Sequence, residues 1–227
     1  AAAYRGFRLP TLNELLRPFV IFPLVTQANA ELEPERLEGF EVGADIAPAD
    51  GVSFSLTAFD NRLKGAIANV TLAPNLRQRR NLEAIDAQGV EAEAQFARGP
   101  FCLDLSATLT DAQVRDSGAA AALNGNRPPQ VPRFSANMRA AYACECGALA
   151  ALTLRHVSQQ FEGDQETGIL PAATTLGAYV QIPLSKRFAA VARAENLLDE
   201  RIVTRNSGGA IDLGVPRTIW LGVRLGY

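Results

Sequence analysis

The sequence predicts an all-β protein, built as an antiparallel transmembrane β-barrel of about ten strands. Three observations predict this fold: apolar and polar residues alternate in successive segments, the connections between segments are by turns short and long, and aromatic residues gather near the short connections. In a membrane barrel every second strand residue faces lipid, short turns lie at one end and long loops at the other, and aromatic rings mark the water interfaces. A soluble sandwich would instead place its largest aromatics near mid-strand, where two sheets meet.

The strands can be assigned in order along the chain. A partial first strand, Tyr4 to Leu9, leads into a long connection from Pro10 to Glu33. Strict alternation then places the following residues on apolar faces: Phe40, Val42, Ala44 and Ile46; Val90, Ala92, Ala94 and Phe96; Phe101, Leu103, Leu105, Ala107 and Leu109; Phe134, Ala136, Met138, Ala140 and Tyr142; Leu176, Ala178, Val180 and Ile182; Phe188, Ala190, Ala192 and Ala194. With the long stretches Val52 to Val70 and Leu149 to Phe161, and the last segment, the count is about ten.

The last segment, Arg217 to Tyr227, alternates most clearly. One face carries Ile219, Leu221, Val223, Leu225 and Tyr227, and the other carries Thr218, Gly222, Arg224 and Gly226. A closing strand that ends on an aromatic is expected of an outer-membrane barrel, where the terminal ring lies at the interface.

Connections support the same fold. Asp50-Gly51 is the strongest hairpin signal, because both residues tolerate the positive φ of a tight primed turn. The predicted short turns are Pro48 to Gly51, Arg98 to Pro100, Cys144 to Gly147 and Leu184 to Arg187. The predicted long loops, besides the first, are Ala73 to Arg79, Arg115 to Pro132, Glu162 to Pro171 and Leu197 to Val215.

Six aromatic residues share the apolar parity and lie at the short-turn ends of their strands. We predict that they anchor the barrel at the membrane interface; they are Phe54, Phe96, Phe101, Tyr142, Phe188 and Tyr227. At the opposite interface fewer aromatic residues are predicted, namely Phe40 and Phe134.

Composition excludes several other classes. The chain of 227 residues has a net charge of -2 and lacks a basic stripe, so nucleic acid is not expected as a partner. No apolar run reaches the roughly 18 residues of a transmembrane helix. The start, A-A-A-Y-R-G-F, lacks the basic and apolar regions of a signal peptide, so either the protein is not exported or its true N-terminus is missing.

A family resemblance extends over the whole length. Six segments, in order, resemble the C-terminal barrel half of TonB-dependent outer-membrane receptors: F-R-L-P-T-L-N-E-L (Phe7 to Leu15), L-E-P-E-R-L-E-G-F-E-V-G (Leu32 to Gly43), Q-G-V-E-A-E (Gln88 to Glu93), P-Q-V-P-R (Pro129 to Arg133), R-A-E-N-L-L-D-E (Arg193 to Glu200) and G-V-P-R-T with L-G-V-R-L (Gly214 to Leu225). Barrels of this family have 22 strands and a plugged lumen. The resemblance therefore implies that residues 1–227 form a partial barrel, about ten strands of a larger one, without the plug domain.

The resemblance also implies a function and partners. The parent protein would lie in the bacterial outer membrane and import a scarce nutrient, such as a ferric siderophore or cobalamin, by energy-coupled transport. Its partners would be outer-membrane lipid, the plug domain and remaining barrel strands, the TonB energy-transducing complex acting through the missing N-terminal part, and a small-molecule metal chelate or vitamin. No catalysis, no cofactor and no metal site of the chain's own is expected.

Charged residues supply the candidate site. Residues with inward parity would face the plug and water in the lumen; they are Glu41, Glu91, Glu93, Arg139, Arg155, Arg193 and Glu195. In the family, ligand contacts come mainly from extracellular loops and the plug apex, here Pro10 to Glu33, Leu72 to Arg80 and Arg115 to Arg127. Arg77, Arg79 and Arg80 could attract an anionic ferric chelate, although a charge run in a loop is usually just solvated.

Two competing readings remain. A stand-alone ten-stranded channel or adhesion barrel would need a closed sheet, which even strand number permits. An outer-membrane lipase would need His156 and Ser158, yet no third orienting group is evident, and a lone histidine near an interface is more often an anchor.

The three cysteines, Cys102, Cys144 and Cys146, are too few for a structural zinc site. A bridge between Cys102 and Cys144 and three unpaired, packed thiols are about equally expected.

Overall fold

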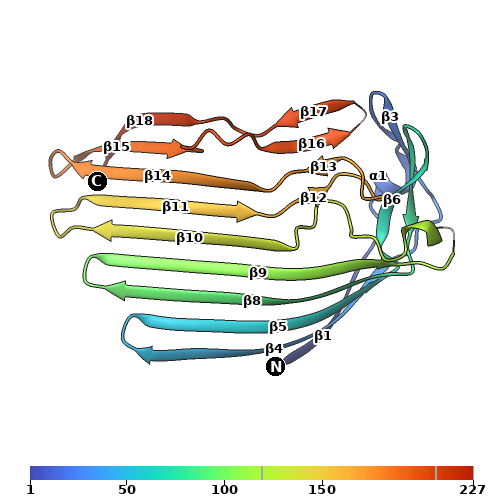
Figure 1. Cartoon of the computed structure of the whole chain (residues 1–227), viewed down its shortest axis with the longest axis horizontal. Helices are drawn as coiled ribbons and strands as arrows, with labels where there is room; N and C mark the ends of the chain where they lie inside the picture. Colours follow the sequence, from blue (N-terminus) through green and yellow to red (C-terminus); the bar gives the residue numbers. More distant parts are fainter. Residues whose placement is uncertain (119, 208, 227) are drawn as a thin grey trace.

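A single antiparallel sheet of ten strands dominates the computed structural model, which describes residues 1–118, 120–207 and 209–226. Its strands are β1 (Ala2–Arg8), β4 (Glu35–Ala49), β5 (Val52–Lys64), β8 (Ala84–Arg98), β9 (Phe101–Arg115), β10 (Phe134–Ala143), β11 (Leu149–Val157), β14 (Ala173–Pro183), β15 (Phe188–Glu195) and β18 (Thr218–Leu225). They pair in that order, each with the next along the chain, so the sheet is a meander with β1 and β18 at its two edges (Figure 1). The predicted fold class and strand number are confirmed.

Strand register sorts the side chains onto two faces. Directly paired residues share a face, and one such row runs Val42, Ala58, Val90, Leu109 and Phe134 across five neighbouring strands. This apolar face is called the outer face, because in a membrane barrel lipid covers it. Its large residues are exposed, with Leu221 at 82% and Val223 at 65%, as expected where the sheet itself buries nothing on that side.

The opposite, polar face is called the inner face. Its rows contain hydroxyl and charged side chains, such as Ser55, Glu93 and Ser106, which lie side by side on β5, β8 and β9. The sequence alternation therefore fixes which face meets lipid, because a shift of one residue would exchange the two sets.

All four short turns lie where the sequence predicts them, together at one end of the sheet (Figure 1). Gly51, Gly99 and Gly147 have positive φ values of 73°, 56° and 83°. At Gly51 a side chain would also collide with the chain, because an added Cβ would lie 2.1 Å from the carbonyl oxygen of Ala97. Glycine is required there for both reasons.

The long connections at the other end hold further structure. They contain α1 (Leu12–Leu16), β2 (Phe19–Ile21), β3 (Leu24–Gln27), β6 (Ile67–Ala73), β7 (Leu76–Asn81), the 3₁₀ turn η1 (Ala121–Leu123), β12 (Gln160–Phe161), β13 (Ile169–Leu170), β16 (Val203–Ser207) and β17 (Ala210–Leu213). Strands β2, β3, β7 and β6 form a separate four-stranded sheet. No helix among the described residues is long and apolar enough to cross a membrane.

Three sequence predictions for these segments are wrong in detail. The stretch Val52 to Val70 is two strands, because Gly65, at φ 64°, ends β5 and redirects the chain into β6. The predicted loop Ala73 to Arg79 is instead the tip and second strand of the β6–β7 hairpin, turned at Pro74 and Asn75. Leu149 to Phe161 likewise divides into β11 and β12.

The buried apolar cluster lies in the connections rather than in the sheet. It consists of Ala66, Val70, Leu82, Val114, Ala120 and Leu123, with Leu63, Ala68 and Ile85 packed against it. The cluster joins the β6–β7 hairpin to the end of β9 and the connection after it, so these connections form a packed unit.

Candidate functional site: the inner face and the loop assembly

The predicted lumen residues lie on the inner face, along the middle of the sheet. Glu91 is opposite Thr57, Glu93 is opposite Ser55, and Arg155 is opposite Thr175. A hollow of about 500 Å³ lies along part of this face, and its lining includes Asp45, Glu93 and Arg139.

Charge is distributed unevenly over the inner face. Arg139 pairs with Asp104 at 2.9 Å, and Arg193 pairs with Glu195 and lies over the ring of Trp220 at 5.6 Å. Among the described residues, Glu41, Glu91, Glu93 and Arg155 have no ion-pair partner. Because an unpaired charge is costly unless it is hydrated or paired, these four side chains need water or a counter-charge on the inner face.

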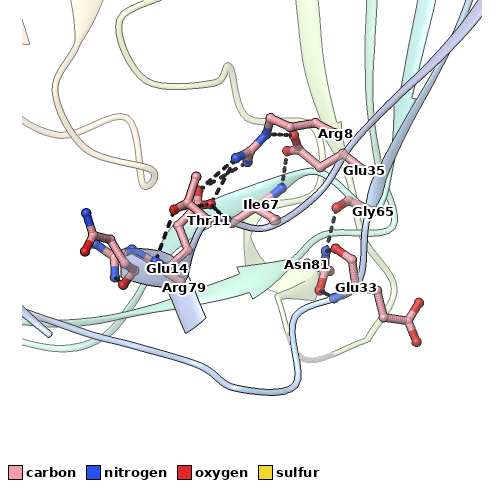
Figure 2. Close-up of polar contacts among 10 residues, drawn as sticks. Arg8, Thr11, Glu14, Glu33, Glu35, Gly65, Ile67, Arg79 and Asn81 are labelled. Atoms are coloured by element: carbon pink, nitrogen blue, oxygen red, sulfur yellow. Dashed lines mark hydrogen bonds and ion pairs between the residues drawn. The ribbon is translucent and has the colours of Figure 1, made fainter. Parts of the chain in front are cut away.

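The long connections are held together by polar contacts; we call residues 9–34, 65–83, 116–133, 158–172 and 196–217 the loop assembly. At its first contact, Arg8 at the end of β1 pairs with Glu35 and, at 2.9 Å, with Glu14 of α1 (Figure 2). The second carboxylate oxygen of Glu35, only 7% exposed, accepts a hydrogen bond from the Ile67 amide at 2.7 Å. This network joins β1, α1, β4 and β6.

Helix α1 is short and is stabilised at its first turn. The hydroxyl oxygen of Thr11 accepts a hydrogen bond from the Glu14 amide, and the Glu14 carboxylate accepts one from the Thr11 amide, which completes a capping box. The hydrogen bonds from Arg8, followed by those from Thr11, hold the pKa of Glu14 at about 2, below its ordinary value of 4.5. Glu14 therefore stays ionised and fixes α1 to the rim of the sheet.

The three predicted ligand arginines are on β7 rather than in a loop. The guanidinium of Arg79 donates to the carbonyl oxygens of Asn13 at 2.7 Å and Arg17 at 2.9 Å, so it holds the end of α1 (Figure 2 shows its position). Arg80 donates to the side chain of Gln78 at 2.9 Å. Arg77 has neither a hydrogen-bond nor an ion-pair partner among the residues described, which leaves its guanidinium available.

Arg77 lies in a row with an aromatic side chain. Thr26 of β3 is opposite Arg77 on one side and Phe19 of β2 on the other. Phe19 is 55% exposed, and the residues after it are also exposed, with Phe22 at 92%. This four-stranded sheet was not predicted from the sequence, although the pair Pro74-Asn75 is a turn signal at its central hairpin, and Asn75 adopts the positive φ of 62° that such a turn requires.

A second set of hydrogen bonds, centred on Asp164, joins three connections. This residue is 7% exposed, and its carboxylate accepts hydrogen bonds from the amide of Thr71 at 2.8 Å and its hydroxyl at 2.6 Å. Its carbonyl oxygen accepts a hydrogen bond from the side chain of Asn126 at 3.2 Å. The connection after β11 is thereby attached to the β6–β7 hairpin and to the connection after β9.

The connection between β15 and β18, residues 196–217, is attached to the connection between β11 and β14, residues 158–172. Asn206 of β16 donates to the carbonyl oxygen of Ile169 at 3.0 Å, and within the β16–β17 hairpin Arg205 pairs with Asp212 at 2.7 Å. That hydrogen-bonded pair lowers the pKa of Asp212. The loop assembly is therefore held together by specific contacts between its connections.

Family membership follows from a match over most of the chain. The family model described as "TonB dependent receptor-like, beta-barrel" matches residues 1–197. The chain belongs to the TonB-dependent receptors. As such it lies in the bacterial outer membrane, and it is not an enzyme.

Several solved structures of TonB-dependent proteins share the fold. The ferric yersiniabactin uptake receptor FyuA from Yersinia pestis is 19% identical with a TM-score of 0.75, and the match covers 98% of this chain and 34% of FyuA. The copper transporter OprC is 16% identical with a TM-score of 0.74, covering 99% of this chain and 36% of OprC. The siderophore receptor PiuA from Acinetobacter baumannii is 18% identical with a TM-score of 0.71, covering 86% of this chain and 29% of PiuA. The chain thus spans about a third of the length of these structures.

The predicted interface anchors among the described residues share the outer face, which is consistent in parity with the sequence prediction. Phe54 and Phe96 pack edge to face with ring centroids 5.4 Å apart, and Phe101 and Tyr142 lie 5.0 Å apart across β9 and β10. Phe188 is also on the outer face, opposite Leu225. Tyr227 lies outside the described residues.

His156 and Ser158 do not form a dyad. His156 shares a hydrogen bond with Thr174 at 2.8 Å and lies against Phe134 on the outer face. The hydroxyl of Ser158 accepts a hydrogen bond from the Phe134 amide at 3.0 Å. Both groups are used structurally.

The cysteine pairing differs from both sequence expectations. Cys144 and Cys146 form a disulfide within the β10–β11 turn, and Cys102 is free. Cys102 cannot take part as first suggested, because its side chain is on the inner face beside Asp104, whereas Cys144 has left the strand. The described residues contain no cluster of metal-binding side chains.

Proposed function

We propose that residues 1–227 are the C-terminal part of the barrel of an outer-membrane receptor, and that the parent protein imports a ferric siderophore, cobalamin or a similar scarce nutrient by energy-coupled transport. The observation that carries this proposal is the combination of an open sheet with an ordered loop assembly. Among the described residues β1 pairs only with β4 and β18 only with β15. Both edges carry backbone groups that lipid cannot satisfy, so they need further strands.

The inner face supports a plug domain as the second partner. Its unpaired Glu41, Glu91, Glu93 and Arg155 would find counter-charges or water there. Rearrangement of that plug, driven by the TonB energy-transducing complex through the part of the parent that precedes this chain, would release the bound nutrient inward. A stand-alone ten-stranded channel is the weaker alternative, because it requires β1 to pair with β18.

For ligand capture we propose the end of the loop assembly around Arg77. An anionic metal chelate with aromatic groups would suit the available guanidinium of Arg77 and the exposed ring of Phe19, since arginine binds carboxylates and phenolates by charge-assisted hydrogen bonds. Arg79 would act indirectly, because its guanidinium already holds α1, and Arg80 lies on the opposite face of β7 from Arg77.

The proposal is tested by ligand binding and iron-limited growth with the full-length parent. Arg77→Gln should weaken the binding of an anionic ferric chelate by at least about tenfold, the loss expected for one hydrogen bond to a charged group. Arg80→Gln is the matched control, with the same charge change on the same strand, and should change binding little. Equal affinity of wild type and Arg77→Gln for every ferric chelate that supports growth would contradict the assignment of Arg77. Failure of the parent to bind any metal chelate or cobalamin would contradict the proposed function itself.

A further inference from the structure

Three hollows lie in successive rows along the outer face of β8 and β9, from the middle of the apolar belt toward the end that carries the long connections. Together they are called the furrow. An apolar hollow of about 520 Å³ lies over Ala92 and Ala107, a middle one of about 670 Å³ lies over Val90 and Leu109, and a charged one of about 370 Å³ lies over Asp86. The last two share Gln88 and Asp111, so they adjoin directly.

The lower hollow is shaped for an apolar chain. Its floor is made of short side chains on three neighbouring strands, and its sides are made of larger ones; the floor residues are Ala92, Ala94, Ala107 and Ala136, and the sides include Phe54, Leu56, Leu105, Met138 and Leu154. All of these residues have outer-face parity. In a membrane such a hollow is filled by an acyl chain, because no protein side chain covers it and water is absent.

The upper hollow is lined by ion pairs that leave basic groups accessible. Asp86 is shared by Arg62 at 3.6 Å and Arg115 at 3.0 Å, and the side chains of these arginines are still 53% and 42% exposed. Arg133 adjoins the middle hollow, 3.9 Å from Asp111, with its side chain 64% exposed. Each guanidinium has five N–H donors, so one shared carboxylate leaves donors free.

Net charge on this part of the outer face is positive. The relevant part of the outer face lies between the row of Val90 and Leu109 and the long connections, on strands β1, β4, β5, β8 and β9. With Arg133, which contacts Asp111, its side chains include six basic and four acidic residues. The basic ones are Arg5, Arg36, Arg62, Lys64, Arg115 and Arg133, and the acidic ones are Glu38, Asp60, Asp86 and Asp111. Glu38 is likewise shared, by Lys64 at 2.6 Å and Arg5 at 3.6 Å. The surface therefore attracts anions.

The spacing of the two ends matches one membrane leaflet. The row with Ala92 and the row with Arg62 and Asp86 are three rows apart on the same face. At about 7 Å per row and a strand tilt of roughly 40°, this is about 15 Å along the membrane normal, which is half the thickness of the hydrocarbon core. A lipid with its headgroup at Arg62 and Arg115 would thus place an acyl chain in the alanine-floored hollow.

We propose that this furrow binds one anionic, phosphorylated lipid of the leaflet at the long-connection end of the barrel. The phosphate accepts hydrogen bonds from the free donors of Arg62, Arg115 and Arg133, and one acyl chain lies over Ala92 and Ala107. The proposal rests on the membrane location and on the long connections lying at the headgroup level of that leaflet, and it does not depend on nutrient import. The lipid would hold β8, β9 and the start of β10 together below the loop assembly.

Native mass spectrometry of the full-length parent in detergent tests the proposal, with phosphatidylglycerol as the anionic probe and phosphatidylcholine as the zwitterionic one. Wild type should bind phosphatidylglycerol more tightly. The double variant Arg62→Gln/Arg115→Gln should lose roughly thirtyfold in affinity, as expected for the removal of two basic residues at a membrane surface. Ala107→Phe, which fills the hollow without a charge change, should also weaken binding.

Two controls match these variants. Arg155→Gln makes the same kind of charge change on the inner face, and Ala192→Phe adds the same ring to the outer face of β15, away from the furrow. Both should bind phosphatidylglycerol as wild type does. A gel-mobility shift on heating shows that each variant is folded, and ferric-chelate binding reports separately on the receptor function. Equal affinity for the two lipids in wild type, or equal loss in Arg155→Gln and the double variant, would overturn the proposal.

Discussion

Removal of the Asp164 carboxylate should open the loop assembly without unfolding the barrel. Asp164→Ala deletes two hydrogen bonds, from the amide and the hydroxyl of Thr71, and leaves the amide without a partner in a partly buried site. Hydrogen bonds to a charged group contribute about 1.5–3 kcal/mol each, so loss of the pair should cost about 3 kcal/mol or more. The ten-stranded sheet keeps its own ladder, and its stability should change little.

Hydrogen exchange measures this opening directly. If the free energy needed to open the contact between the connection after β11 and the β6–β7 hairpin falls by about 3 kcal/mol, hydrogen exchange at the Thr71 amide and in β6 should accelerate by roughly a hundredfold. Glu162→Ala is the control. It removes a carboxylate from the same connection, and among the described residues that carboxylate accepts a hydrogen bond only from the side chain of Gln130. Unchanged exchange at Thr71 in Asp164→Ala, or the same acceleration in Glu162→Ala, would refute the claim that the Asp164 carboxylate attaches the connection after β11 to the β6–β7 hairpin.

Four further predictions follow from the geometry. Arg in place of Ala92 should cost about 2–4 kcal/mol in a membrane-assembly assay if the site lies near the bilayer midplane, whereas Arg in place of Glu93 should be tolerated; equal tolerance would reverse the faces. The Arg8–Glu14 contact should hold above pH 4.5 and weaken as the pH falls toward 2, because the folded pKa of Glu14 lies below its unfolded value. Proteolysis of the 9–34 connection in wild type should therefore rise as the pH falls over that range. A Glu14→Gln variant with the same pH dependence would show that protonation of Glu14 is not the cause. His156→Asn should leave assembly and ligand capture nearly unchanged, and loss of a lipase activity on this change would contradict the non-enzymatic assignment. A thiol reagent should label Cys102 alone in the unreduced, unfolded chain, and labelling of all three cysteines would exclude the disulfide.

Strand faces could be predicted from the sequence because period-two alternation is a local property. The alternation alone assigns Glu91, Glu93 and Arg139 to one face. Three of the four short turns contain a glycine, whereas the fourth, Leu184 to Arg187, has neither glycine nor proline and is indicated only by the alternation on either side of it. The pairing order also followed, since a barrel with short turns is a meander.

The loop assembly could not be predicted in the same way, because its contacts join residues far apart in the chain. Asp164 and Thr71 are 93 residues apart, and Arg79 and Asn13 are 66 apart. Nothing in the run Arg77 to Arg80 indicates that Arg79 holds a helix end while Arg77 has no partner. Likewise, the pairing of Cys144 with Cys146 depends on the shape of one turn, which spacing alone does not specify.

The central claim is that this sheet is part of a larger barrel, and expression of residues 1–227 alone tests it most directly. The chain should be refolded in detergent beside the full-length parent, and both should be compared by gel mobility before and after boiling. We predict that the parent shifts on boiling and that residues 1–227 alone aggregate without a heat-modifiable band, because the edges of β1 and β18 are left unpaired. A monomeric, detergent-stable species of residues 1–227 that shifts on boiling would contradict the account and support a closed ten-stranded barrel.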